Sequence, residues 1–159
     1  MHTDKTLKDD LVTALSKTIE LFGLSTLESR LFAYLYLVDE PKTLDEMSEA
    51  LGKSKTAMST SIRSLAEFNL VSQVWQKGIR KDLYVANSQL YRAFMNFYFK
   101  KWVDKTERQR EVLEEILEDA KENPEQDSWE TIHLVGKLAD IIEFHSEIED
   151  TFNTLQREK

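Results

Sequence analysis

Residues 43–84 constrain the fold of this chain of 159 residues more than any other segment, because they hold start and stop signals for two short helices. Thr43 and Glu46 have the spacing of a capping box, which predicts a helix that runs to about Leu51. Gly52 is expected to end this helix, since glycine enters the left-handed region at little cost. Ser54 is a favourable N-cap for a second helix over residues 55–68. The segment therefore predicts two helices joined by a tight turn.

The second of these helices has one apolar and one polar face. Its apolar residues Met58, Ile62 and Leu65 recur at helical spacing, and we expect them to pack on Met47 and Leu51 of the first helix. The opposite face is rich in hydroxyl and basic groups, which contact base edges and phosphates in the major groove of DNA. The candidate DNA-binding residues on this face are Ser54, Lys55, Thr56, Ser59, Thr60 and Arg63.

A basic β-hairpin is predicted after the second helix. Asn69 is expected to turn the chain through the left-handed region, which Asn enters more cheaply than most residues. Residues 70–75 and 79–85 are strand-like and flank a turn at residues 76–78. The hairpin carries cations that could reach phosphates or a minor groove, and its candidate DNA-binding residues are Lys77, Gly78 and Arg80. Helix, turn, helix and hairpin in this order are the layout of a winged helix-turn-helix.

The distribution of charge sharpens this interpretation. A net charge of −8 for the whole chain argues, by itself, against a polyanionic partner. Residues 53–81 nevertheless carry six Lys or Arg against one Glu, a local charge of +5, whereas residues 124–159 carry three basic against nine acidic residues, a local charge of −6. Such asymmetry would orient DNA on one surface. Two alternatives stay open: a merely solvated basic face, and a winged-helix protein-interaction module that does not bind DNA.

The chain resembles the GbsR branch of the MarR-type winged-helix regulators over about residues 10–105. Three stretches carry the resemblance: FGLSTLESRLFAYLYL, TLDEMSEALGKSKTAMSTSIRSL and VWQKGIRKDLY. The resemblance implies a homodimeric bacterial transcriptional regulator that binds a palindromic operator in double-stranded DNA. It also implies a repressor of genes for the uptake or synthesis of glycine betaine, with choline or glycine betaine as a possible effector. The family's DNA contacts carry over to Lys55, Thr56, Ser59, Thr60 and Arg63, and its wing contacts to Lys77, Gly78 and Arg80.

The rest of the chain predicts long helices, so the fold class is mostly α with a small β-hairpin. Helices are expected over residues 5–22, 25–38, 89–121 and 128–155, while the polar stretch 104–111 is open between helix and break. Long amphipathic helices at both ends favour a homodimer over a monomer whose helices fold back on each other. We expect a single domain, 1–159. Residues 24–87 would form its DNA-binding part, and residues 1–23 and 88–159 its helical dimerisation part, where a ligand site is also considered.

Aromatic residues crowd the start of the long helix expected after the hairpin. A quaternary ammonium ion such as choline or glycine betaine has no N–H donor and binds to aromatic faces. An aromatic stripe at helical spacing also packs in a core, and both interpretations stay open. The candidate ligand-binding residues are Tyr91, Phe94, Phe97, Tyr98 and Trp102.

The sequence predicts neither a catalytic site nor a metal site. The three His residues are scattered, and the acidic runs lack the spacing of a metal-binding loop. There is no glycine-rich phosphate loop and no nucleophile elbow. The chain has no Cys and no apolar run long enough to span a bilayer. We therefore expect a cytoplasmic protein that is not an enzyme, uses no cofactor and has no membrane partner.

Overall fold

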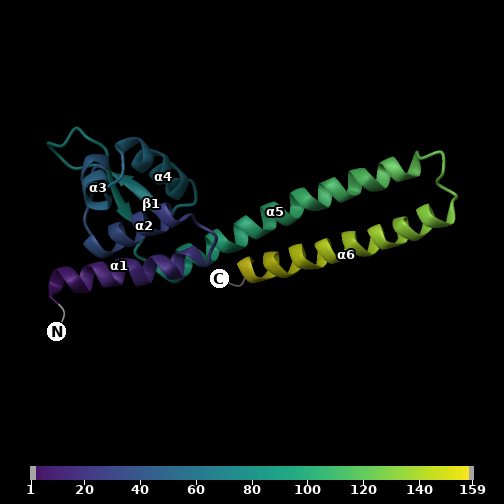
Figure 1. Ribbon diagram of the computed structural model, residues 1–159, viewed down its shortest axis with the longest axis horizontal. Helices are drawn as coiled ribbons and strands as arrows, with labels where there is room; N and C mark the ends of the chain where they lie inside the picture. The colour runs from purple at the N-terminus through teal and green to yellow at the C-terminus, as the bar shows by residue number, and fades with distance from the viewer. Residues whose placement is uncertain (1–2, 158–159) are drawn as a thin grey trace. The chain divides into compact units, whose positions relative to one another are not determined.

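The computed structural model describes residues 3–157, which form six helices and one two-stranded antiparallel sheet (Figure 1). The mostly α fold with a small hairpin agrees with the prediction. The chain divides into two compact units, the first ending at Phe97 and the second starting at Tyr98. The first unit includes the N-terminal helix, which the predicted division had grouped with residues 88–159. The elements are α1 (Asp4–Glu20), α2 (Thr26–Val38), α3 (Leu44–Leu51), α4 (Lys55–Glu67), β1 (Val71–Val74), β2 (Leu83–Ala86), α5 (Leu90–Lys121) and α6 (Trp129–Arg157).

Side-chain caps begin α3 and α4, and a glycine ends α3. The Thr43 hydroxyl accepts a hydrogen bond from the Glu46 amide at 3.1 Å, and the Glu46 carboxylate accepts one from the Thr43 amide at 3.1 Å. Gly52 follows α3 with φ +66°, in the left-handed region. The Ser54 hydroxyl then accepts from the Ala57 amide at 3.0 Å and caps α4. The predicted helix-turn-helix is confirmed at each of these positions.

Two glycine substitutions are expected to change stability in opposite directions. A Cβ at Gly52 meets no atom within 4 Å, so Gly52→Ala should cost only the strain of its positive φ, about 1 kcal/mol. A Cβ at Gly136, inside α6, also meets nothing within 4 Å, so Gly136→Ala should stabilise by about 0.5–1 kcal/mol through helix propensity. Chemical denaturation of both variants checks this pair, and a Gly52→Ala protein as stable as the wild type would contradict the assigned turn.

The core of the first unit is built around α2, which packs against α1, α4 and the hairpin. Leu31 and Phe32 of α2 are completely buried, as are Met47 of α3 and Met58 and Leu65 of α4. The predicted packing of the apolar face of α4 on α3 is therefore confirmed. This packing leaves the hydroxyl-rich face of α4 turned away from the core.

The hairpin has shorter strands and a longer loop than the sequence predicts. β1 pairs with β2 from Val71–Ala86 to Val74–Leu83, which leaves an eight-residue loop over residues 75–82. The predicted second strand over residues 79–85 is wrong in its first half, because residues 80–82 are three successive charged side chains with no apolar face to bury. The side chain of Gln73 donates to Asp82 at 2.9 Å where pairing ends. Residues 75–82 are called the wing loop below.

The second unit consists of α5 from Tyr98 onward and the whole of α6. In this unit α6 runs back alongside α5 (Figure 1). The polar stretch 104–111 lies inside α5 and is therefore helical, without a break. Arg110 of α5 donates to Glu149 of α6 at 2.7 Å and to Glu114 at 2.9 Å, which gives this stretch polar partners. None of the described helices is long and apolar enough to cross a membrane.

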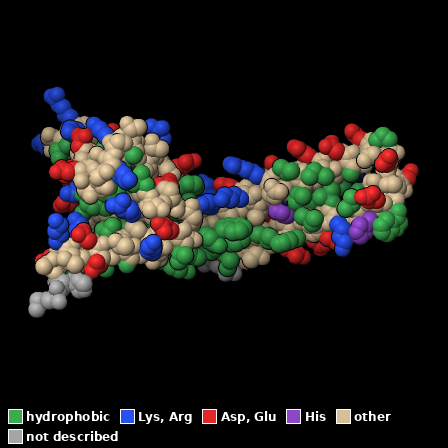
Figure 2. Space-filling model, viewed as in Figure 1, with side chains coloured by type: hydrophobic (Ala, Val, Ile, Leu, Met, Phe, Trp, Pro, Cys, Tyr) green, Lys and Arg blue, Asp and Glu red, His purple; other side chains and the backbone are tan. Residues whose placement is uncertain are grey.

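Apolar side chains remain exposed on both helices of the second unit, and Figure 2 shows green hydrophobic patches there. Exposed apolar side chains that lie together, rather than singly, are typical of surfaces that contact another molecule. The exposed residues are Val112, Ile116, Ile132, Leu134, Ile141 and Phe144.

Candidate nucleic-acid interface

The structure brings the predicted recognition residues together on one face of α4. Met58, Ile62 and Leu65 hold the opposite face against the core, with exposed fractions of 3% or less. Ser61 is also buried, so this hydroxyl is not part of the polar face. The predicted residues are all exposed except for the half-buried Ser59, and they are Ser54, Lys55, Thr56, Ser59, Thr60 and Arg63.

Hydrogen bonds within α4 determine what its hydroxyl groups offer to a ligand. Ser54 uses an oxygen lone pair to cap the helix, so its O–H remains able to donate to a phosphate. The Thr60 hydroxyl donates to the Thr56 carbonyl at 3.1 Å, so its remaining lone pair can accept from a base amino group. Lys55 and Arg63 supply two cations to the same face. This face therefore combines cations and hydroxyl groups, the two kinds of side chain that contact phosphates and base edges in protein–DNA complexes.

The wing loop carries the other predicted residues. Lys77, Gly78 and Arg80 are exposed, and Gly78 has φ +86°, which lets the chain reverse at the tip. The Ile79 amide donates to the Gln76 carbonyl at 3.2 Å and closes this turn. Lys and Arg side chains, drawn in blue, lie at the outer edge of this unit in Figure 2. The loop thus presents exposed cations on a short structured turn.

Asp45 is a residue of this surface that the sequence analysis missed. It lies in the first turn of α3, 3.4 Å from Lys55 Nζ and 2.7 Å from Lys81 Nζ. The hydrogen bond from Lys81 and then the charge of Lys55 lower the pKa of the Asp45 carboxyl, and Asp45 raises the pKa of Lys81. An acidic residue in the first turn of a helix is common, so the sequence gives Asp45 no role beyond the start of α3. Its contact with Lys81 becomes visible only in the folded structure.

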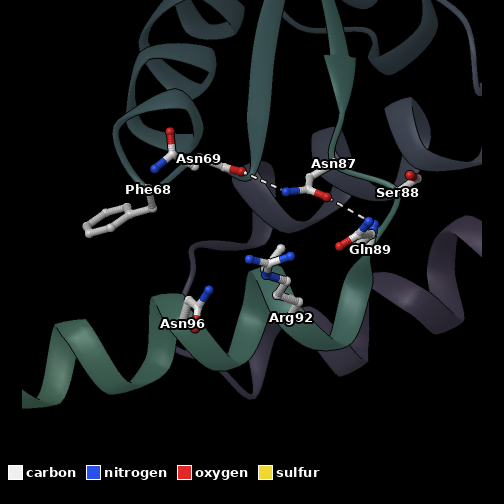
Figure 3. Close-up of a pocket in the computed structure, with 8 residues that line it drawn as sticks. Phe68, Asn69, Asn87, Ser88, Gln89, Arg92 and Asn96 are labelled. Atoms are coloured by element: carbon white, nitrogen blue, oxygen red, sulfur yellow. Dashed lines mark hydrogen bonds between the residues drawn. The ribbon is translucent and has the colours of Figure 1, made fainter. Parts of the chain in front are cut away.

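A polar junction fixes the hairpin to the start of α5 (Figure 3). The Asn87 side chain donates to the Asn69 carbonyl at 3.3 Å and accepts from the Gln89 amide at 3.0 Å. Asn69 has φ +60°, as predicted. Arg92 and Asn96 rise from α5 toward these groups, beside a pocket of about 360 Å³. The junction is open and polar, and it ties the end of α4 to the end of β2.

The five predicted ligand-binding aromatics have different surroundings. Phe94 and Phe97 are buried in the first unit, where Phe94 meets Phe32 at 4.9 Å and Phe97 meets Phe68 at 4.7 Å between ring centroids. Their ring faces are thus covered by the core. Tyr91 is 76% exposed. Phe94 and Phe97 are therefore available to a ligand only if the core opens.

The remaining two aromatics form a cluster in the second unit. Trp102 stacks on Phe152 of α6 with ring centroids 5.7 Å apart, and Tyr98 lies 6.2 Å from Trp102. Trp102 keeps 41% of its surface exposed, so one part of its ring remains open to solvent. Phe152 was not among the predicted residues because it lies fifty positions from Trp102 in sequence. Residues 3–157 contain no group of three His, Asp or Glu side chains suited to a metal ion.

Comparison with known proteins supports the interpretation of the chain as a transcriptional regulator. No protein-family model matches the chain. The chain is 34% identical over 113 residues to the HTH-type transcriptional repressor GbsR of Bacillus subtilis, which covers 71% of this chain and 60% of that protein. It is 33% identical over 95 residues to the HTH-type transcriptional repressor OpcR of the same organism, covering 60% of this chain and 51% of OpcR. The chain thus spans between half and two thirds of the length of these relatives.

A solved structure of a transcriptional regulator shares the fold. It aligns over 92% of this chain and 98% of its own, with a TM-score of 0.56 and 20% identity. The sequence relatives are transcriptional regulators, a non-enzymatic class, in agreement with the prediction that this chain is not an enzyme. The resemblance to the GbsR branch of the MarR-type winged-helix regulators, predicted from the helix-turn-helix and its wing, is confirmed.

Proposed function

We propose that the protein is a sequence-specific DNA-binding transcriptional repressor. The observation that carries this proposal is the exposed face of α4, where hydroxyl groups, Lys55 and Arg63 lie together beside the cationic wing loop on an otherwise acidic chain. The face of α4 would enter a major groove, and the wing loop would contact the flanking backbone or minor groove. The names of the relatives, transcriptional repressors of the HTH type, support the same function.

The DNA-binding form is proposed to be a homodimer. The exposed apolar residues of α5 and α6 in the second unit supply a surface that a second copy would cover. A two-fold symmetric dimer presents two α4 helices, which fits a palindromic operator with half-sites about one helical turn apart. The bound DNA is therefore expected to contain an inverted repeat.

A binding-site selection tests this function. The purified full chain is incubated with a pool of random duplexes, and the retained duplexes are sequenced after several rounds. The expected result is enrichment of one inverted repeat whose binding weakens steeply as salt is raised. Absence of any enriched sequence, with no salt-dependent binding to duplex DNA, would favour the alternative of a protein-interaction module and overturn the proposal.

A regulated gene class and an effector are proposed on the resemblance to the GbsR branch. The protein would repress genes for the uptake or synthesis of osmoprotectants and would sense choline or glycine betaine. The cluster of Tyr98, Trp102 and Phe152 supports this proposal, because the exposed part of the Trp102 ring can receive a trimethylammonium group. A ligand regulates DNA binding only if it binds two dimer geometries with different affinity.

Trp fluorescence during a titration with choline, and separately with glycine betaine, checks the effector. The expected result is a saturable change at millimolar ligand that Trp102→Ala abolishes and Trp129→Ala preserves. Trp129 is a matched control, because it is 79% exposed on α6 and stacks on His133 rather than in the cluster. No change in the wild type, or a change that survives Trp102→Ala, would leave these aromatics as packing residues.

A further inference from the structure

Asp45 lies where three elements of the candidate DNA interface meet. One carboxylate oxygen is 3.4 Å from the ammonium of Lys55, the first residue of α4, and the other is 2.7 Å from the ammonium of Lys81 in the wing loop. A pocket of about 240 Å³ opens beside them, lined also by Thr43 and Arg80. A single carboxylate of α3 therefore connects the recognition helix to the wing loop.

The wing loop has few other attachments. The Gln76–Ile79 turn and the bond from Gln73 to Asp82 both lie within the hairpin. Among the described residues, the contact of Lys81 with Asp45 is the only hydrogen bond or ion pair that joins residues 75–82 to a part of the chain outside the hairpin. The side chains of residues 75–82 are all exposed, so burial does not fix the loop either. Asp45 is thus the residue that connects the wing loop to α3 and, through Lys55, to α4.

Neither attraction for DNA nor a contribution to stability explains why a carboxylate lies at position 45. Asp45 lies between cations that would face phosphates, and a carboxylate repels phosphate. Isolated ion pairs in solvent contribute little to stability, and the Asp45 and Lys81 side chains are 46% and 66% exposed. The shared carboxylate nevertheless limits where both ammonium groups can lie.

We propose that Asp45 is a positioning residue for DNA recognition, which sets the wing loop against the N-terminal end of α4 before DNA binds. This inference rests on the proposed DNA-binding function. Binding costs free energy when loops and long side chains become ordered, so a wing loop that is already placed favours the duplex whose spacing matches it. Asp45 therefore contributes to discrimination between duplexes rather than to attraction for DNA in general.

The charge of Asp45 and its positioning role can be separated with a matched control. Asp45→Asn removes one negative charge and both ion pairs, whereas Glu49→Gln removes one negative charge from an exposed position of the same helix. Glu49 makes no ion pair or side-chain hydrogen bond with another described residue. Loss of charge alone raises the affinity for every duplex, while loss of positioning lowers the ratio of affinities for a matched and an unmatched duplex.

The test compares the wild-type full chain with Asp45→Asn, Asp45→Glu and Glu49→Gln. The probes are the duplex that the wild type selects from the random pool and a shuffled duplex of equal length. In Asp45→Asn, backbone amides of residues 75–82 should exchange hydrogen several-fold faster in the free protein, and the affinity ratio should fall about threefold to tenfold. Glu49→Gln should keep both wild-type values, and Asp45→Glu, which retains the carboxylate, should recover most of the protection.

The exchange measurement tests whether Asp45 holds the wing loop, and the affinity ratio tests whether Asp45 contributes to DNA recognition. Unchanged exchange in Asp45→Asn would show that Asp45 does not hold the wing loop, with or without DNA. Faster exchange with an unchanged affinity ratio would overturn its role in recognition. If the wild type selects no duplex, the proposed function and the recognition role fail together, and the exchange measurement still decides whether Asp45 holds the loop.

Discussion

Replacing Lys55, Thr60 and Arg63 together with Ala is expected to lower the affinity for the selected duplex at least about a hundredfold at moderate salt. These three side chains are exposed on the face of α4 that the core leaves free. One good bidentate contact from Arg to guanine contributes about 1–3 kcal/mol of discrimination, and a dimer would lose two such contacts. Each phosphate contact that is lost should also reduce the slope of log affinity against log salt by about 0.9.

A matched variant separates this effect from the change in total charge. Lys105, Arg108 and Thr151 are exposed residues of the same three types in the second unit. The Thr151 hydroxyl donates to the Glu147 carbonyl at 2.9 Å, the same internal bond that Thr60 makes. Replacing all three with Ala should change affinity much less than the triple variant of α4. Gel shifts of both variants measure the difference, and equal losses would mean that α4 does not read DNA.

Leu31→Ala is expected to lower the free energy of unfolding of the first unit by about 2–5 kcal/mol. Leu31 is completely buried in α2, the helix that α1, α4 and the hairpin all contact, so truncation leaves a cavity that neighbouring elements cannot fill together. The same change at Leu21, which is 82% exposed just after α1, is expected to shift stability by no more than about 0.5 kcal/mol.

Chemical denaturation at a fixed protein concentration measures both leucine variants. The wing loop and the face of α4 depend on this core for their positions, so Leu31→Ala should also weaken DNA binding at temperatures where it unfolds. Similar stabilities for Leu31→Ala and Leu21→Ala would contradict the assignment of α2 as the centre of the first unit.

The parts of the fold that local chemistry determines could be predicted from the sequence. Caps at Thr43 and Ser54 and the left-handed residues Gly52 and Asn69 act within a few positions, and the structure has each of them where predicted. The polar face of α4 follows from the same periodicity, because Met58 and its apolar neighbours must turn inward.

The parts that depend on contacts between distant residues could not be predicted. Asp45 meets Lys81 thirty-six positions away, and Trp102 stacks on Phe152, and neither pairing has a local signal. The bridge between Lys42 and Tyr84, with hydrogen bonds of 3.0 and 2.9 Å, likewise adds a pairing to the hairpin that no strand pattern indicates. The length of the wing loop was also misjudged, because charged residues near a turn fit both a strand and a loop.

The salt dependence of binding to the selected duplex tests the central claim most directly. Wild type and the triple Ala variant of Lys55, Thr60 and Arg63 are titrated with the same duplex over a range of salt concentrations. If α4 and the wing loop form the DNA-binding surface, the wild type should bind the selected duplex with a steep negative salt slope, and the variant should bind more weakly with a shallower slope. Equal affinities and equal slopes for the two proteins would contradict it.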